Sequence, residues 1–319
     1  MAHEISIRAD GFAEIAFVGD TPWHKLGQSI NPDATIEEWQ QQAGMDWTIE
    51  SAPVFYTTAN NGIQTFPHQN VLHRSDTGAS LGIVSDRYHA VQPKQVLEFF
   101  RELVDVAGFK IQVAGTLKGG RRLWAIANTG RFEEVAKNDG IGSFLLLSTS
   151  CDRSLATTAR FTSVRVVCNN TLSYAVSEEN KTAVSFTHLS KFDPAKMQER
   201  LMKGVSSFSG FMQTARWLNT QRMLVTESEA FLAALLKPVS QVEDGDIREN
   251  RQYQAILSLF DGGAKGSEMC RHTKWAMLNA VTEFYDHHQP SRSDDARLNS
   301  AWFGNGDKIK NNALMLLTA

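Results

Sequence analysis

The spacing of apolar residues changes along the chain and predicts strands first, then a mixture, then helices. Residues 1–32 show no clear period and are expected to form an N-terminal arm. Between Trp47 and Val91, short runs typical of strands end in turn signals such as Asn60-Asn61-Gly62 and Asp76-Thr77-Gly78. This pattern predicts an antiparallel meander of about three strands.

Two helices are predicted around this meander by their end signals. Thr35 followed by Glu38 forms a capping-box pattern, and Gly44 suits the residue after the helix. Pro93 suits the first position of a second helix, whose apolar residues share one face, and Gly108 ends it.

A second hairpin is predicted around the turn Lys118-Gly119-Gly120-Arg121, and the run GSFLLLSTS predicts a further strand. Residues 152–176 are interpreted as a strand that leads into a helix. Because strands and helices do not alternate regularly, the fold class is α+β rather than α/β.

The chain becomes helical after Asp193. Asp193-Pro194 opens a long helix, and Thr226 with Glu229 is a second capping-box pattern. Further helices are expected at 248–260 and 272–288. The expected organisation has three parts: an arm at 1–32, an α+β domain at 33–190 and a helical part at 191–319.

Composition places the chain among ordinary globular proteins. Of its 319 residues, 42% are hydrophobic and 21% are charged, and its three cysteines show no CxxC spacing. It shows neither an apolar run long enough for a bilayer nor the pattern of a secretory signal at its start. We therefore expect a cytoplasmic protein with reduced thiols and no membrane association.

Charge is distributed unevenly and indicates a binding face. Residues 1–107 hold 6 Lys and Arg against 14 Asp and Glu, whereas residues 108–175 hold 9 against 4. A basic segment can neutralise phosphates, and aromatic residues within it can stack on bases. Arginines on strands also often pair with carboxylates of their own domain, and both interpretations remain open. The candidate phosphate contacts are Lys118, Arg121, Arg122, Arg153, Arg160 and Arg165, and the candidate stacking residues are Trp124 and Phe161.

Catalytic and metal-binding interpretations are weaker. The segment Gly262–Ser267 is rich in glycine but lacks the spacing of a phosphate loop, and it follows a predicted helix rather than a strand. Glu283 and His287 share a helix face without an HExxH motif, so a surface pair is favoured over a metal site. Cys168 lacks a visible general base and is read as a buried thiol. We expect neither an enzyme nor a bound metal or cofactor.

The segment Thr21–Gly27, TPWHKLG, combines a proline, an indole, an imidazole and an ammonium group. Trp23 and Leu26 suit anchoring of the chain in a groove. This would leave His24 and Lys25 toward water or a ligand. Anchoring is favoured, and a partner surface formed by Trp23, His24 and Lys25 is the alternative.

The chain resembles a known family through several segments in order. MAHEI, TPWHKLG, AGMDW, FTSVRVVCNNTL, TKWAMLNAVTEFYDH and GNGDKIKNNAL look like the phage/plasmid-like protein family (domain of unknown function 932). This resemblance implies a mobile-element context. The meander followed by a helix is also similar in element order to Rad-fifty-two-like single-strand annealing proteins, although no motif matches.

These observations lead to one expected function and one alternative. We expect a DNA-binding protein of a phage or plasmid that binds and anneals single-stranded DNA in recombination, as a homo-oligomer. Annealing needs no catalytic residue, because it requires only neutralised phosphates and accessible base edges. The alternative is an interaction protein that inhibits a host defence or replication factor.

Overall fold

A computed structural model of the chain describes most of its residues, and the chain divides into two compact units. Unit 1 comprises residues 1–129, 145–160 and 183–200, and unit 2 comprises 130–144, 161–182 and 201–319. Both units therefore draw on segments from either side of residue 190. The described residues are 7–8, 10–19, 26–59, 62–152, 154–155, 157–165, 170–173, 183–186, 194–236 and 247–319.

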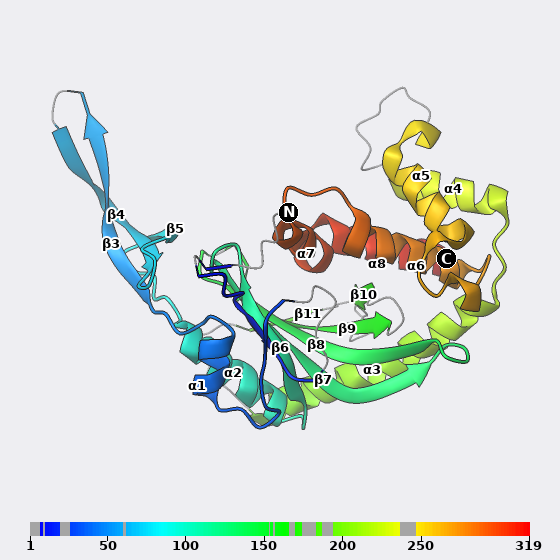
Figure 1. Ribbon diagram of the computed structural model, residues 1–319, viewed down its shortest axis with the longest axis horizontal. Coiled ribbons are helices and arrows are strands. Elements are labelled where there is room, and N and C mark those ends of the chain that lie inside the picture. Colours follow the sequence, from blue (N-terminus) through cyan, green and yellow to red (C-terminus); the bar gives the residue numbers. More distant parts are fainter. Residues whose placement is uncertain are drawn as a thin grey trace. The chain divides into compact units, whose positions relative to one another are not determined.

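Within the described residues, the larger sheet has the strand order β10-β9-β8-β7-β6-β1-β2, and β11 also pairs with β9 (Figure 1). Strands β7, β8 and β9 have segments in both units. Neighbouring pairs for which a register is known are antiparallel, apart from the parallel pair β1–β2. The strands are β1 (Ile15–Phe17), β2 (Gln28–Ser29), β6 (Lys110–Leu117), β7 (Arg122–Glu134), β8 (Gly140–Ser150), β9 (Thr157–Arg165), β10 (Asn170–Ser173) and β11 (Ala183–Phe186).

Unit 1 also holds a separate antiparallel sheet in the order β3-β4-β5. Its strands are β3 (Ile49–Thr58), β4 (Gly62–Arg74) and β5 (Ser80–Ser85). β5 is short and pairs only with Gln69–His73 of β4, so the far part of β3 and β4 forms a two-stranded ribbon. Figure 1 shows this ribbon extending beyond β5.

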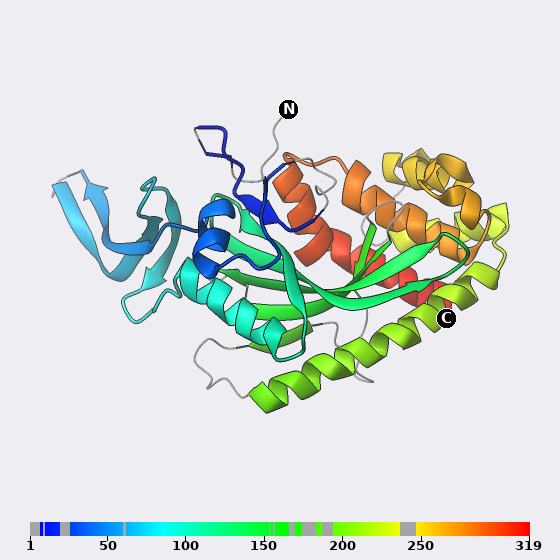
Figure 2. The same cartoon turned by 60° about the horizontal axis from the view of Figure 1, so that its bottom comes forward.

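Two helices of unit 1 follow the predicted end signals. α1 (Ile36–Gln42) starts with a capping box, in which the Glu38 amide donates to the Thr35 hydroxyl and the Thr35 amide donates to the Glu38 carboxylate. α2 (Pro93–Asp105) begins at its proline and buries one apolar face. It packs against α1 and β6, as Figure 2 also shows.

Unit 2 is built around a buried helix. Every residue from Trp275 to Glu283 of α6 is buried, because α8 and β10 pack on this helix. Helix α3 begins in unit 1 and continues through unit 2, where Leu201, Phe208 and Met212 join the core. The helices are α3 (Pro194–Thr220), α4 (Val225–Leu236), α5 (Arg251–Ser258), α6 (Lys274–Glu283), α7 (Asp294–Phe303) and α8 (Asn305–Thr318), and π-helical turns at Leu259–Gly263 and Phe284–His288 extend α5 and α6.

The α+β class, the meander, the second hairpin and the helical C-terminal part are confirmed. One predicted helix is wrong: residues 170–173 form strand β10, which pairs with β9 and is held by Asp286 through the Thr171 amide and hydroxyl. The second capping box is also wrong, because α4 already begins at Val225 and Glu227 accepts from the Leu224 amide instead. None of the described helices is long and apolar enough to cross a membrane.

Candidate nucleic-acid interface

The turn between β6 and β7 has an unusual backbone. Lys118, Gly119 and Gly120 follow one another with φ of 56°, 67° and 91°. Glycine adopts positive φ without a steric penalty, whereas a residue with a Cβ atom is strained there. We call Lys118–Arg121 the basic turn. Its two cationic side chains, Lys118 and Arg121, are both exposed.

Arg121 is held by neutral groups. Its guanidinium donates to the Ser80 carbonyl at 3.4 Å, and its own carbonyl accepts from the Cys151 amide at 2.8 Å. Among the residues that the structure describes, no carboxylate forms an ion pair with Arg121. Its charge therefore remains available to an anionic ligand.

The basic turn rests on a buried arginine and tryptophan. The Arg74 guanidinium lies 4.4 Å from the centre of the Trp47 ring, and it also donates to the Gly119 carbonyl at 3.4 Å. A Cβ atom at Gly120 would lie 2.7 Å from the Trp47 ring and 3.0 Å from Arg74 Nη1. Close packing and positive φ both require glycine at position 120.

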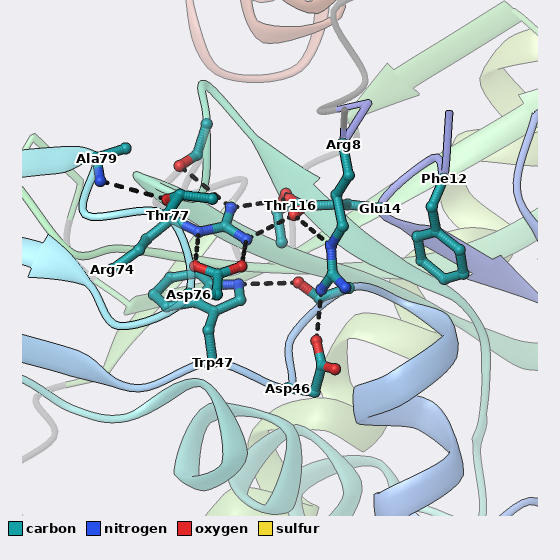
Figure 3. A network of polar contacts seen from close by, with 12 residues as sticks. Arg8, Phe12, Glu14, Asp46, Trp47, Arg74, Asp76, Thr77, Ala79 and Thr116 are labelled. Carbon is teal, nitrogen blue, oxygen red and sulfur yellow. Dashed lines mark hydrogen bonds and ion pairs between the residues drawn. The ribbon is translucent and has the colours of Figure 1, made fainter. Parts of the chain in front are cut away.

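Arg74 belongs to a charged network that Figure 3 shows from close by. Its guanidinium donates to both carboxylate oxygens of Glu14, at 3.1 and 2.6 Å, and to both oxygens of Asp76, at 2.9 and 2.7 Å. Arg8 donates to Glu14 at 3.2 Å and also pairs with Asp46, and the Thr116 hydroxyl donates to Glu14. We call Arg8, Glu14, Asp46, Arg74, Asp76 and Thr116 the anchor network.

The centre of the anchor network is buried, and its margin is exposed to solvent. Glu14, Arg74 and Thr116 are buried, whereas the Asp46 side chain is 43% exposed. Burial alone would lower the pKa of Arg74, but its hydrogen bonds and ion pairs with Asp76 and Glu14 outweigh burial and raise it. Burial would likewise raise the pKa of Asp76, yet the contacts with Arg74 hold that pKa below its usual value. The network thus ties the N-terminal segment, the end of β4 and the basic turn together.

Two other predicted residues of β7 face inward. Arg122 is 5% exposed and its guanidinium reaches the Ser154 hydroxyl at 3.5 Å. Trp124 is 2% exposed and lies opposite Gly115 of β6. The prediction that Trp124 stacks on bases is wrong for this structure, because its ring is enclosed in the core. Burial equally removes Arg122 from the accessible phosphate contacts.

Two predicted residues of unit 2 are also buried. Phe161 packs against α3 at Gly204, where a Cβ atom would lie 1.9 Å from its ring. Arg165 donates to Asp139 at 2.5 Å and to the carbonyls of Lys265 and Gly266 at 3.2 and 3.1 Å. The prediction that Phe161 stacks on bases is therefore wrong. Arg165 forms an internal ion pair, which was one of the two interpretations that the sequence left open.

Of the five remaining predicted site residues, the structure describes one. Arg160, in the part of β9 that belongs to unit 1, is half-buried. Arg153, Trp23, His24 and Lys25 lie outside the described residues, as does Cys168. Lys118 and Arg121 are therefore the predicted contacts that the structure places together on one exposed turn.

The segments considered for catalysis have structural roles. The Lys265 amide in the glycine-rich segment donates to the Glu283 carboxylate at 3.0 Å, so a side chain already occupies this loop amide. Glu283 is buried rather than on the surface, and its carboxylate lies 3.5 Å from His288. Among the described residues, no group of three or more His, Cys, Asp or Glu could hold a metal.

Two described cysteines are poor nucleophiles. Burial, with a smaller contribution from the Asp152 charge, raises the pKa of the Cys151 thiol to about 12. Burial also raises the pKa of the Cys270 thiol to about 11, although Arg165 lies beside it. With pKa values this high, both thiols remain protonated near neutral pH. Because the thiolate is the reactive form, neither side chain is a good nucleophile.

A buried ion pair in unit 2 was missed by sequence reasoning. Lys310 of α8 is 1% exposed and donates to Asp286 at 2.5 Å and to the Thr171 carbonyl at 2.8 Å. Asp286 is itself only 6% exposed. The three residues are widely separated in sequence and no local pattern marks them as partners.

The structure thus defines an α+β protein with an exposed basic turn above a buried anchor network. The chain belongs to the family described as domain of unknown function (DUF932), whose model matches residues 80–302. No curated protein and no solved structure matches it.

Proposed function

We propose that the chain is a DNA-binding protein of a phage or plasmid, and that it binds single-stranded DNA through the basic turn. The observation that carries this proposal is the exposed pair Lys118 and Arg121 on a backbone held by Arg74 and Trp47. A preorganised cationic site loses little conformational entropy when it binds a phosphate. The resemblance to phage/plasmid-like proteins supports the mobile-element context.

The burial of the two candidate stacking residues determines which contacts this proposal uses. With Trp124 and Phe161 in the core, binding would rest on phosphate contacts rather than on stacking by these rings. Such binding depends weakly on sequence and strongly on salt. It also leaves base edges accessible for pairing, which is what strand annealing in recombination requires.

Fluorescence anisotropy of a labelled single-stranded oligonucleotide tests the proposal. The variant K118A/R121A removes both charges of the basic turn, and its control R101A/K110A removes two exposed cations from α2 and the far end of β6. Each phosphate contact on a single strand contributes about 0.7 to the slope of log K against log salt. We therefore expect K118A/R121A to lower the slope by about 1.4, whereas the control changes it little.

Two results would count against this function. Equal losses in both variants would show that the basic turn is not the site. An absence of binding by the natural sequence at low salt would reject DNA binding altogether. The alternative, inhibition of a host defence or replication factor, would then be pursued by capture of host proteins after nuclease treatment.

A further inference from the structure

The ribbon beyond β5 is exposed and strongly apolar. We define the ribbon as Val54–Thr58 of β3 and Gly62–Phe66 of β4. Four of its side chains are large hydrophobic groups in water: Phe55 is 59% exposed, Tyr56 46%, Ile63 72% and Phe66 48%. Exposed large hydrophobic side chains that gather in one short segment mark an interaction site more often than scattered single residues do.

The strand register separates these side chains onto two faces. Phe55 pairs with Thr65 and Thr57 pairs with Ile63, so Phe55 and Ile63 share one face, which we call the outer face. Tyr56 and Phe66 lie on the opposite face and contact each other edge to face, with ring centres 6.1 Å apart. The outer face therefore holds the two most exposed large hydrophobic side chains of the ribbon.

The ribbon and its flanks carry no formal charge apart from one histidine. From Ser51 to Asn70, the sequence contains His68 and no Asp, Glu, Lys or Arg. Natural proteins commonly protect exposed strands with lysine or other charges, and here that protection is missing. The ribbon also lacks the cations that neutralise phosphates, so it is unsuited to nucleic acid. Anionic membranes are disfavoured because residues 1–107 hold 14 acidic against 6 basic residues.

The ends of the ribbon indicate how a partner would bind. Pro53 and Pro67 flank it on β3 and β4, and proline has no amide to donate to an added strand. Addition of a strand along either edge is therefore interrupted at the base of the ribbon. Packing by a face has no such obstacle.

We propose that the outer face of the ribbon is a self-association surface, which packs on the outer face of a second copy of this chain. An isologous contact requires a patch that is complementary to itself, and an uncharged apolar face meets that requirement without repulsion between like charges. This surface is distinct from the basic turn and does not depend on the proposed DNA binding.

The small size of the face sets the strength of the association. Phe55 and Ile63 together expose an area on the order of 200 Å² per copy, against about 800 Å² per partner in a standard interface. Association through this face is therefore weak and depends on concentration. Measurements should extend from a few micromolar to several hundred micromolar.

Sedimentation velocity of nuclease-treated protein over this range tests the proposal. We expect the mass of the natural sequence to rise with concentration, and F55S/I63S to remain monomeric at concentrations at least 10-fold higher. The control I83S removes a side chain of β5 that is 61% exposed but lies outside the ribbon, and it should associate like the natural sequence. Circular dichroism of each variant confirms that it is folded.

Cysteine substitution tests the face directly. Thr65 lies on the outer face and Gln64 on the other, and both are exposed. In a C168S background, whose other cysteines are buried, T65C should form an intermolecular disulfide under mild oxidation and Q64C should not. A natural sequence that stays monomeric, association that survives F55S/I63S, or equal cross-linking of T65C and Q64C would each overturn the proposal. A monomer would leave a foreign protein as the occupant of the ribbon.

Discussion

Two hairpins of unit 1, β3–β4 and β6–β7, differ in how their ends are supported. The end of β6–β7 is cationic and rests on Trp47 and on Arg74, a member of the anchor network. The ribbon of β3–β4 is uncharged, and within the described part of the chain no third strand lies beside it. Both hairpins are antiparallel and both have glycine with positive φ next to or within the connection, so strand pairing alone does not distinguish them.

Because of this difference in charge and support, the two hairpin ends suit different classes of ligand. A cationic turn with fixed geometry can hold phosphates, because it gains charge-assisted hydrogen bonds without reorganising. An apolar ribbon gains free energy only when another apolar surface covers it. The contrast agrees with the two proposals, in which the basic turn binds nucleic acid and the ribbon contacts protein.

The largest expected effect comes from removing the central charge of the anchor network. E14Q leaves Arg74 buried without one of its two carboxylates. Breaking a buried ion pair from one side typically costs about 3–5 kcal/mol of unfolding free energy. Urea denaturation measures this loss. In hydrogen exchange, E14Q should accelerate exchange at the basic turn more than at the ribbon, relative to the natural sequence.

E50Q is the matched control for this change. Glu50 is 56% exposed and lies 3.9 Å from His73 in the same unit. Exposed ion pairs contribute about 0–1 kcal/mol, so this variant should stay close to the natural sequence. Similar losses for E14Q and E50Q would show that the anchor network does not support the turn.

A smaller effect is expected from packing at the turn itself. G120A places a Cβ atom at φ 91° and within 2.7 Å of the Trp47 ring, so the ring or the backbone must move. Positive φ costs about 1–2 kcal/mol and the steric overlap adds about 1–2 kcal/mol. G119A is the control, since position 119 has φ 67° but nothing within 4 Å of a new Cβ atom. Thermal unfolding should rank G120A below G119A, and the reverse order would contradict the proposed packing.

Much of this fold could be predicted because its signals are local. Thr35 and Glu38 form the predicted capping box, and Pro93 begins α2 as expected. The turn at Lys118–Arg121 is encoded by its two glycines. The failure at residues 170–173 has a tertiary cause, because Asp286 and pairing with β9 hold the segment as a strand.

Burial within the candidate site could not be predicted from spacing. Arg165 and Asp139 are far apart in sequence, yet they meet in the core and so remove one predicted phosphate contact. Trp124 lies in a basic segment but is buried on β7, as are its neighbours Leu123 and Ala125. The anchor network joins Glu14 to Arg74 across an even longer separation, and each residue alone resembles an ordinary surface charge.

The smallest expected effect lies at the solvent side of the anchor network and depends on pH. The pKa of Asp76 is lowered in the folded protein, since the contacts with Arg74 outweigh the opposing effect of burial. Its carboxylate therefore stabilises the fold above its unfolded pKa of about 4, and this stabilisation is lost as the pH falls through the lower folded pKa. D76N should cost about 1 kcal/mol at pH 7, and less below about pH 4.

The control D86N changes an exposed carboxylate that accepts from His68 beside the ribbon. Denaturation of D76N, D86N and the natural sequence at pH 7 and pH 3 measures both differences. A cost for D76N that is the same at both pH values would show that its charge is not what supports Arg74. A larger cost for D86N would place the stronger electrostatic support at the ribbon, which would reverse the comparison between the two hairpins.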